Sequence, residues 1–283
     1  MKTLTLLTCL ALGWGLAVSA APVPVPEPAP NPTPAPAPVP VLETHWKGKK
    51  VAFLGDSITD PKQANRIYWQ FLEERLGLKP LVYAVSGYRW HQMLPMAEKL
   101  KKDTGGDVDA ILIYVGTNDF NGDVPPGEWW NVTAEEVNRK GVMVRVHRRK
   151  FIYTMDTVRG RINTVMRYIK ANFPDSSVML MTPLHRGYAK FAEKNVQPDE
   201  TCANALGLWI DDYARIIREA GDIWSVPVID LFAEAQLFPN EPAHAKLFRF
   251  KDGNDFLHPN TAGHDRLAEV IMRRMLALPA GFR

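Results

Sequence analysis

Short apolar runs alternate with segments of helical periodicity through most of this chain. Five apolar runs predict strands, and five segments whose apolar residues recur every three to four positions predict helices. The predicted strands span residues 49–54, 81–85, 110–115, 177–182 and 226–230, and the predicted helices span 64–76, 90–102, 154–172, 203–221 and 261–277. Strands that alternate with helices form a parallel sheet covered on both faces, so the pattern predicts a three-layer α/β/α fold.

Two long connections interrupt this alternation, from Phe120 to Tyr153 and from Phe232 to Asn254. Both follow the carboxyl ends of predicted strands, where loops often set specificity, so we expect them to rim a site. Trp129 and Trp130, together with Tyr188 after another strand, could form the flat apolar walls that sugar rings require. In the alternative interpretation, these aromatic residues close a small core beneath the loops.

The first forty residues differ in composition from the rest of the chain. Lys2, the apolar run from Leu4 to Val18 and the small residues Val18-Ser19-Ala20 predict a signal peptide over residues 1–20, cleaved after Ala20. Proline then occupies every even position from 22 to 40, which excludes helix and sheet and predicts an extended linker over residues 21–44. We therefore expect one domain over residues 45–283, exported to the periplasm, the cell surface or the medium.

Composition and charge exclude several classes of function. The net charge of +3 over 283 residues is too small to predict nucleic-acid binding, so the basic cluster from Arg145 to Lys150 is interpreted as a solvated face or loop. No second apolar segment of membrane length follows the leader, which predicts a mature chain without a transmembrane span. Only Cys202 remains after leader removal and no metal-binding motif occurs, so we expect no disulfide within a monomer, no metal and no other cofactor.

The first predicted strand ends in the sequence Gly55-Asp56-Ser57-Ile58. A side chain at the carboxyl end of a strand lies where open α/β sheets carry their sites. A serine at that place can act as a nucleophile if a base is brought to it from elsewhere. Asp and Ser are also common helix N-caps, and this segment alone leaves both interpretations open.

A candidate base and its partner occur near the C-terminus. The neutral imidazole of His258 can accept a serine proton near neutral pH. Asp255 lies three residues earlier, close enough in one turn to accept the other ring N–H and to fix the tautomer. In the alternative interpretation, His258-Pro259 leads into the last helix and Asp255 is a surface turn residue.

Four segments, in this order, resemble the sequence blocks of the SGNH (GDSL-type) hydrolase superfamily: Gly55–Ile58, a block centred on Gly87, Gly116–Asp119 and Asp255–His258. Ile58 stands where the name motif has leucine, a departure that touches no catalytic atom. The resemblance spans roughly residues 49–277. It implies a five-stranded flavodoxin-like sheet in the order 2-1-3-4-5.

The same resemblance implies an oxyanion hole. Its donors would be the backbone N–H groups of Ser57 and Gly87 and the side-chain amide of Asn118, and an acyl-transfer reaction needs such preorganised donors. In the alternative interpretation, Asn118 and Asp119 are turn residues that follow a strand.

Together these features favour an exported serine esterase that works through an acyl-enzyme, with Ser57, His258 and Asp255 as its catalytic residues. The leader, the linker and the aromatic rim favour an O-deacetylase of acetylated carbohydrate, so a small ester or an acetylated glycan is the expected partner. A lipase, lysophospholipase or aryl-esterase is the alternative within the same chemistry. From another class, the chain could be a non-catalytic carbohydrate- or wall-binding module.

Overall fold

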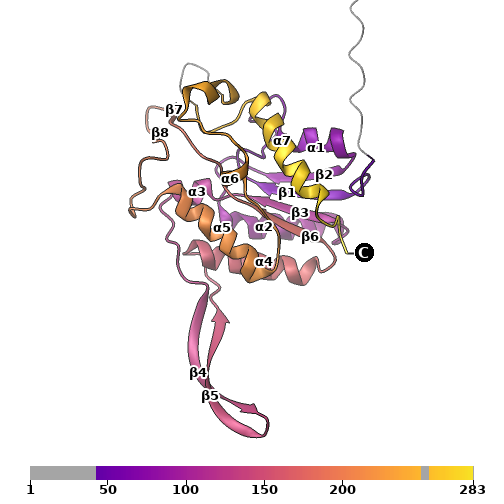
Figure 1. Ribbon diagram of the computed structural model, residues 1–283, viewed down its shortest axis with the longest axis vertical. Coiled ribbons are helices and arrows are strands. Elements are labelled where there is room, and N and C mark those ends of the chain that lie inside the picture. The colour runs from indigo at the N-terminus through magenta and orange to yellow at the C-terminus, as the bar shows by residue number, and fades with distance from the viewer. Residues whose placement is uncertain (1–42, 250–254, 283) are drawn as a thin grey trace, which may run out of the picture. The chain divides into compact units, whose positions relative to one another are not determined.

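The computed structural model describes residues 43–249 and 255–282 (Figure 1). The predicted signal peptide and nearly all of the predicted linker fall within residues 1–42 and lie outside the described residues. In the part of the chain that is described, no helix is both long enough and apolar enough to span a bilayer.

A five-stranded parallel sheet forms the centre of the fold (Figure 1). The order β2-β1-β3-β6-β9 corresponds to 2-1-3-4-5 in the chain order of these strands, which confirms the predicted topology. Each strand begins within two residues of its predicted position. The strands are β1 (Lys50–Gly55), β2 (Lys79–Ala84), β3 (Ala110–Tyr114), β6 (Ser177–Met181) and β9 (Val228–Ile229).

The sheet is buried on both faces. In β1, Val51 and Phe53 contribute to one apolar cluster, whereas Ala52 and Leu54 contribute to the other. Because both sets of side chains leave water, the strand reads as a continuous apolar run rather than as an alternating one. This burial explains why the strands could be located from the sequence.

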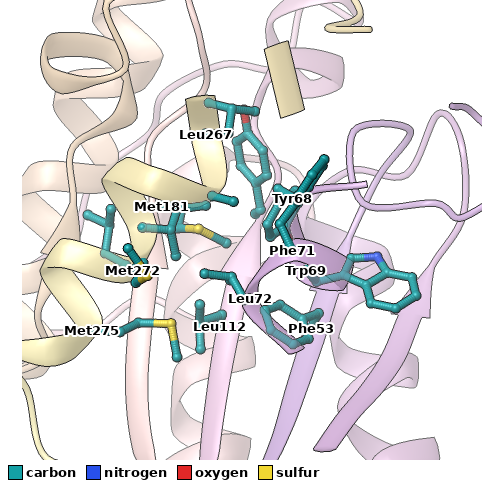
Figure 2. Close-up of a cluster of buried hydrophobic side chains, with 14 of the residues drawn as sticks. Phe53, Tyr68, Trp69, Phe71, Leu72, Leu112, Met181, Leu267, Met272 and Met275 are labelled. Atoms are coloured by element: carbon teal, nitrogen blue, oxygen red, sulfur yellow. The ribbon is translucent and has the colours of Figure 1, made fainter. Parts of the chain in front are cut away.

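Helices form the two outer layers, which confirms the predicted α/β/α architecture. The first cluster lies between the sheet and two helices, and Figure 2 shows its aromatic and methionine side chains packed beside Phe53 and Leu112. The helices over the first cluster are α1 (Tyr68–Leu76) and α7 (Thr261–Leu276), and those over the second cluster are α2 (Trp90–Thr104), α4 (Val158–Asn172) and α5 (Ile210–Trp224).

Three of these helices begin later than the sequence pattern predicts, at 68 instead of 64, 158 instead of 154 and 210 instead of 203. Local side-chain hydrogen bonds fix two of these starts. The Thr157 hydroxyl accepts from Gly160 N and so caps α4. The side-chain oxygen of Asn204 accepts from the backbone N–H groups of Leu206 and Leu208, which holds a turn before α5.

Two β-hairpins outside the central sheet were not predicted. One, formed by β4 (Trp130–Arg139) and β5 (Val142–Phe151), occupies the connection expected to rim the site, and Figure 1 shows it extending away from the sheet and helices. The other is formed by β7 (Ala189–Ala192) and β8 (Asn195–Gln197). Three short helical turns complete the described elements: α3 (Thr117–Asn121), α6 (Leu231–Glu234) and η1 (Pro242–Leu247).

Candidate active site

Ser57 lies in a tight turn directly after β1. The turn is closed by the Asp56 carbonyl, which accepts from the backbone N–H groups of Thr59 and Asp60 at 3.1 and 2.9 Å. Gly55 permits this closure, because a Cβ at that position would lie 2.3 Å from the Thr59 hydroxyl oxygen. The Ser57 side chain is thereby fixed at the carboxyl edge of the sheet, where only 8% of the residue remains exposed.

The structure brings Ser57, His258 and Asp255 into one hydrogen-bonded chain. His258 Nε2 lies 2.8 Å from Ser57 Oγ, and His258 Nδ1 lies 3.0 Å from Asp255 Oδ2. Asp255 Oδ1 also accepts from the backbone N–H of His258 at 3.0 Å, so the carboxylate is held by the turn that carries the imidazole. This geometry allows His258 to take the serine proton while Asp255 holds the ring with Nδ1 protonated.

A buried carboxylate joins the serine turn to the loop after β2. Asp60 Oδ2 accepts from the backbone N–H of Ser86 at 3.2 Å and from its hydroxyl at 3.0 Å. The bond fixes the loop in which Gly87 adopts a φ of +84°, a left-handed conformation that favours glycine. Asp60 therefore positions Gly87 beside Ser57, a role that no spacing in the sequence revealed.

Asn118 reaches the same place from α3, at the end of β3. Its Nδ2 donates to Asp56 Oδ2 at 3.2 Å and to the carbonyl oxygen of Tyr88 at 3.0 Å. Burial raises the pKa of Asp56 to about 7, and the nearby charge of Asp119 adds to the rise, although an N–H donated by Ile58 opposes it. The amide of Asn118 is thus oriented by its neighbours before any substrate is bound.

Asp119 has a structural role rather than a place in the site. It is completely buried, accepts from the backbone N–H of Trp90 at 3.0 Å and forms an ion pair with Arg161 at 2.8 Å. Burial raises its pKa, against the opposing effect of these two partners. Asp119 links α3 to the starts of α2 and α4, and in this way it fixes the helix that carries Asn118.

These groups open into a pocket of about 330 Å³. Ser57 and His258 line this pocket together with side chains that are mostly polar. The two apolar side chains in its wall are Phe191 and Leu257. The other lining residues are Gln63, Ser86, Gly87, Asn118, Asn195, Gln197 and Arg249. The predicted oxyanion residues Ser57, Gly87 and Asn118 all belong to this set.

The aromatic rim predicted from Trp129 and Trp130 is wrong. Trp129 is 93% buried in the apolar cluster beneath α4 and α5, and its indole N–H donates to Glu219 at 2.9 Å. Trp130 packs on Phe151 at a centroid distance of 4.0 Å, at the base of the β4–β5 hairpin. Tyr188 is partly exposed but does not line the pocket. The two tryptophans instead belong to a small core beneath the loops, as in the alternative interpretation, because the pairing of β4 with β5 places them away from the site.

The β7–β8 hairpin forms a wall of the pocket that sequence reasoning missed. Phe191 from β7 meets the His258 ring edge-on at 5.4 Å, and Asn195 and Gln197 line the pocket from the hairpin's second half. The strands have only four and three residues, which is too short for a periodic pattern to reveal them.

Arg249 is the one cation among the described residues that line the pocket. It donates to Gln63 Oε1 at 3.0 Å, and its Nε lies 3.7 Å from Asp255 Oδ2. Arg249 lies in the connection from residue 232 to residue 254, which was predicted to rim the site. This connection therefore does reach the pocket. Among the described residues, no group of three or more His, Cys, Asp or Glu side chains could hold a metal ion.

Comparison with known proteins gives one family and a set of related folds. The model of the GDSL-like lipase/acylhydrolase family matches residues 53–266. No curated protein matches the chain significantly.

Several solved structures share the fold. A protein from Lactobacillus plantarum is 22% identical, with a TM-score of 0.62 over 81% of this chain and 97% of that one. A protein described as a possible lipase from Chitinophaga pinensis is 17% identical, with a TM-score of 0.58 over 81% and 99% of the two chains. The lipase/acylhydrolase from Enterococcus faecalis is also 17% identical, with a TM-score of 0.50 over 81% and 96%.

Proposed function

The chain belongs to the GDSL-like lipase/acylhydrolase family and is an ester hydrolase, and from that premise we propose that it is an exported serine esterase that removes acetyl groups from carbohydrate. The observation that carries the proposal is the hydrogen-bonded chain from Ser57 Oγ through His258 to Asp255 at the floor of a small pocket. Nucleophile, base and orienting carboxylate occur there at hydrogen-bonding distance, as a covalent mechanism requires.

In the proposed reaction, Ser57 Oγ attacks the ester carbonyl carbon while His258 Nε2 takes the hydroxyl proton. The oxyanion that forms is stabilised by the N–H groups of Ser57 and Gly87 and by the Asn118 amide. His258 then gives its proton to the departing alcohol, which leaves an acyl-serine. Water, deprotonated by His258, attacks this acyl-enzyme, and the acid and free Ser57 are released.

The size and lining of the pocket support a short acyl group. A long acyl chain needs a continuous apolar channel, whereas the walls here carry amide, hydroxyl and guanidinium groups from Gln63, Ser86, Asn195, Gln197 and Arg249. These groups can hydrogen-bond the hydroxyls of a sugar. The predicted leader and proline-rich linker support export to a place where such polymers occur.

Labelling with a fluorophosphonate probe tests the assignment of the nucleophile. The wild-type protein should be labelled, and Ser57→Ala should not be. Ser86→Ala is the matched control, because its serine lines the same pocket but is bonded to Asp60, so that variant should still be labelled. A wild-type protein that takes up no label would support a non-catalytic binding module.

A series of p-nitrophenyl esters tests the acyl group. Activity should fall steeply from acetate to octanoate, and acetate should be released from at least one acetylated polysaccharide in a panel of glycans. A series that peaks at eight carbons or more would overturn the deacetylase and favour a lipase.

A further inference from the structure

The β4–β5 hairpin (the arm, residues 130–151) contributes no residue to the proposed reaction. None of its residues lines the pocket of Ser57. Its ten-residue strands pair in register from Trp130↔Phe151 to Arg139↔Val142, and neither belongs to a larger sheet. A two-stranded ribbon alone is marginally stable in water, and its open edges are exposed to other molecules.

Charge on the arm differs from charge on the rest of the chain. The arm carries six Lys or Arg residues and two Glu residues, a net charge of +4, whereas the whole chain carries +3. The remainder of the chain is therefore slightly acidic. The basic residues are Arg139, Lys140, Arg145, Arg148, Arg149 and Lys150. Only Arg148 is neutralised within the arm, by an ion pair with Glu135.

Apolar side chains are exposed on the same arm. Val132, Val142 and Met143 are 55%, 62% and 57% exposed. Val142 and Met143 follow the Lys140-Gly141 turn, so the apolar pair lies at the tip, and Val144 and Val146 continue along β5 as half-buried positions. The tip is therefore apolar beside two cations, and the cluster from Arg145 to Lys150 lies closer to the base.

We propose that the arm lies along the surface of an anionic lipid bilayer, with Val142 and Met143 at its tip entering the interface and the basic side chains along β5 contacting acidic headgroups. Exposed apolar residues among cations are the combination that interfacial binding uses, because apolar burial and attraction to anionic lipid add. A second copy of the chain is a poor occupant, since two arms of charge +4 repel each other. An acidic polymer would match the cations but would leave the valines and the methionine in water.

Co-sedimentation of the full-length mature protein with vesicles tests the proposal. The protein should bind equimolar phosphatidylglycerol–phosphatidylcholine vesicles at least about tenfold more tightly than pure phosphatidylcholine vesicles. Binding should weaken in high salt, because charge contributes to it. Equal binding to the two kinds of vesicle, or binding to neither, would overturn the proposal.

Two matched charge variants locate the effect. R145Q/R149Q/K150Q removes three cations that form no ion pair among the described residues, and it should weaken vesicle binding by about a hundredfold. K79Q/K102Q/K170Q removes three exposed cations from the α/β layers, and it should change binding by less than about threefold. Equal losses in the two variants would show that net charge, and not the arm, is responsible. Hydrolysis of p-nitrophenyl acetate should stay unchanged in both, which also reports correct folding.

A third variant separates a membrane from an acidic polymer. V142S/M143S should weaken vesicle binding by about tenfold, because burial of these side chains is lost, but it should leave binding to dextran sulfate unchanged. If wild-type protein bound dextran sulfate but no vesicles, the partner would be an acidic polymer and the proposal would be wrong. These outcomes do not depend on the acyl group that the enzyme removes.

Discussion

At the scale of single residues, the proposed oxyanion donors around Ser57 are held by groups other than the proposed catalytic residues. Asp60 fixes the loop that carries Gly87, and Asp56 and Tyr88 orient the amide of Asn118. Preorganised donors lower the barrier because they need no rearrangement when the oxyanion forms.

Replacement of Asn118 tests this role. Asn118→Ala should lower kcat by about 10²–10³-fold and change KM by less than about threefold, because the amide is expected to bond the oxyanion rather than the ground-state carbonyl. Steady-state kinetics with p-nitrophenyl acetate measure both constants. An effect confined to KM would make Asn118 a substrate-positioning residue, and a large drop in the thermal unfolding temperature would make it structural.

His264 provides a prediction about pH and stability. It is 99% buried in α7 and stacks on Tyr68, and its Nδ1 has no hydrogen-bond partner among the described residues. Burial, together with the smaller effects of the charges of His258 and Arg249, lowers its pKa to about 3. The fold therefore favours the neutral ring, and the stability that His264 contributes is complete above the unfolded pKa near 6.5 and is lost as the pH falls from there towards 3.

At pH 5 the loss from this residue should be about 2 kcal/mol relative to pH 7, since one pKa unit corresponds to about 1.4 kcal/mol. His264→Phe keeps a ring beside Tyr68 and has no proton to gain, so its unfolding free energy should change less between these pH values. Urea unfolding of both proteins at the two pH values measures the difference. Equal changes in the two proteins would assign the acid sensitivity to another group.

At the scale of elements, a buried arginine fixes the pocket wall formed by the β7–β8 hairpin. Arg186 is fully buried and donates to the side-chain oxygens of Asn121 in α3 and Gln197 in β8, the latter at 3.0 Å. Its guanidinium also lies 5.2 Å from the ring of Phe120. Burial lowers the pKa of Arg186 to about 10, so the side chain remains charged at neutral pH. The same arginine thus holds the hairpin and the helix that bears Asn118.

Arg186→Lys should loosen this wall, because an ammonium group cannot reproduce the planar fork that bonds two acceptors. The KM for an acetylated oligosaccharide should rise by about tenfold, a loss of about 1.4 kcal/mol, with a smaller effect on p-nitrophenyl acetate. Lys190→Gln is the control, an exposed cation on the same hairpin. If both substrates lost activity equally, Arg186 would act on the reacting groups and not on the wall.

At the scale of the whole molecule, the proposed export makes a direct prediction about the N-terminus. Cleavage after Ala20 should give a mature protein that begins at Ala21 and keeps the alternating proline segment. N-terminal sequencing of the protein recovered from an expressing bacterium measures this. A protein that still begins at Met1 and stays with the cytosolic fraction would contradict export.

The sequence by itself determined the central sheet and the identity of the residues at its carboxyl edge. Strands that are buried on both faces appear in the sequence as apolar runs. In a parallel sheet, the polar residues that directly follow these strands lie together at its carboxyl edge. For this reason Ser57 could be named in advance. The roles of Gly87 and Asn118 came from the resemblance to the SGNH hydrolases, and Asp255 and His258 were identified as an orienting carboxylate and a base three residues apart, just before the last helix. The turns that carry these residues are short, so a few neighbouring residues determine them.

Only the tertiary structure decided which side chains surround those residues. Phe191, Gln197 and Arg249 reach the pocket from segments far from Ser57 in sequence, and no periodic pattern marks them. Trp129 and Trp130 were misplaced because their position depends on the pairing of β4 with β5, which carries the connection away from the sheet's edge. Local patterns record burial along one element, whereas the walls of a pocket depend on long-range packing between elements.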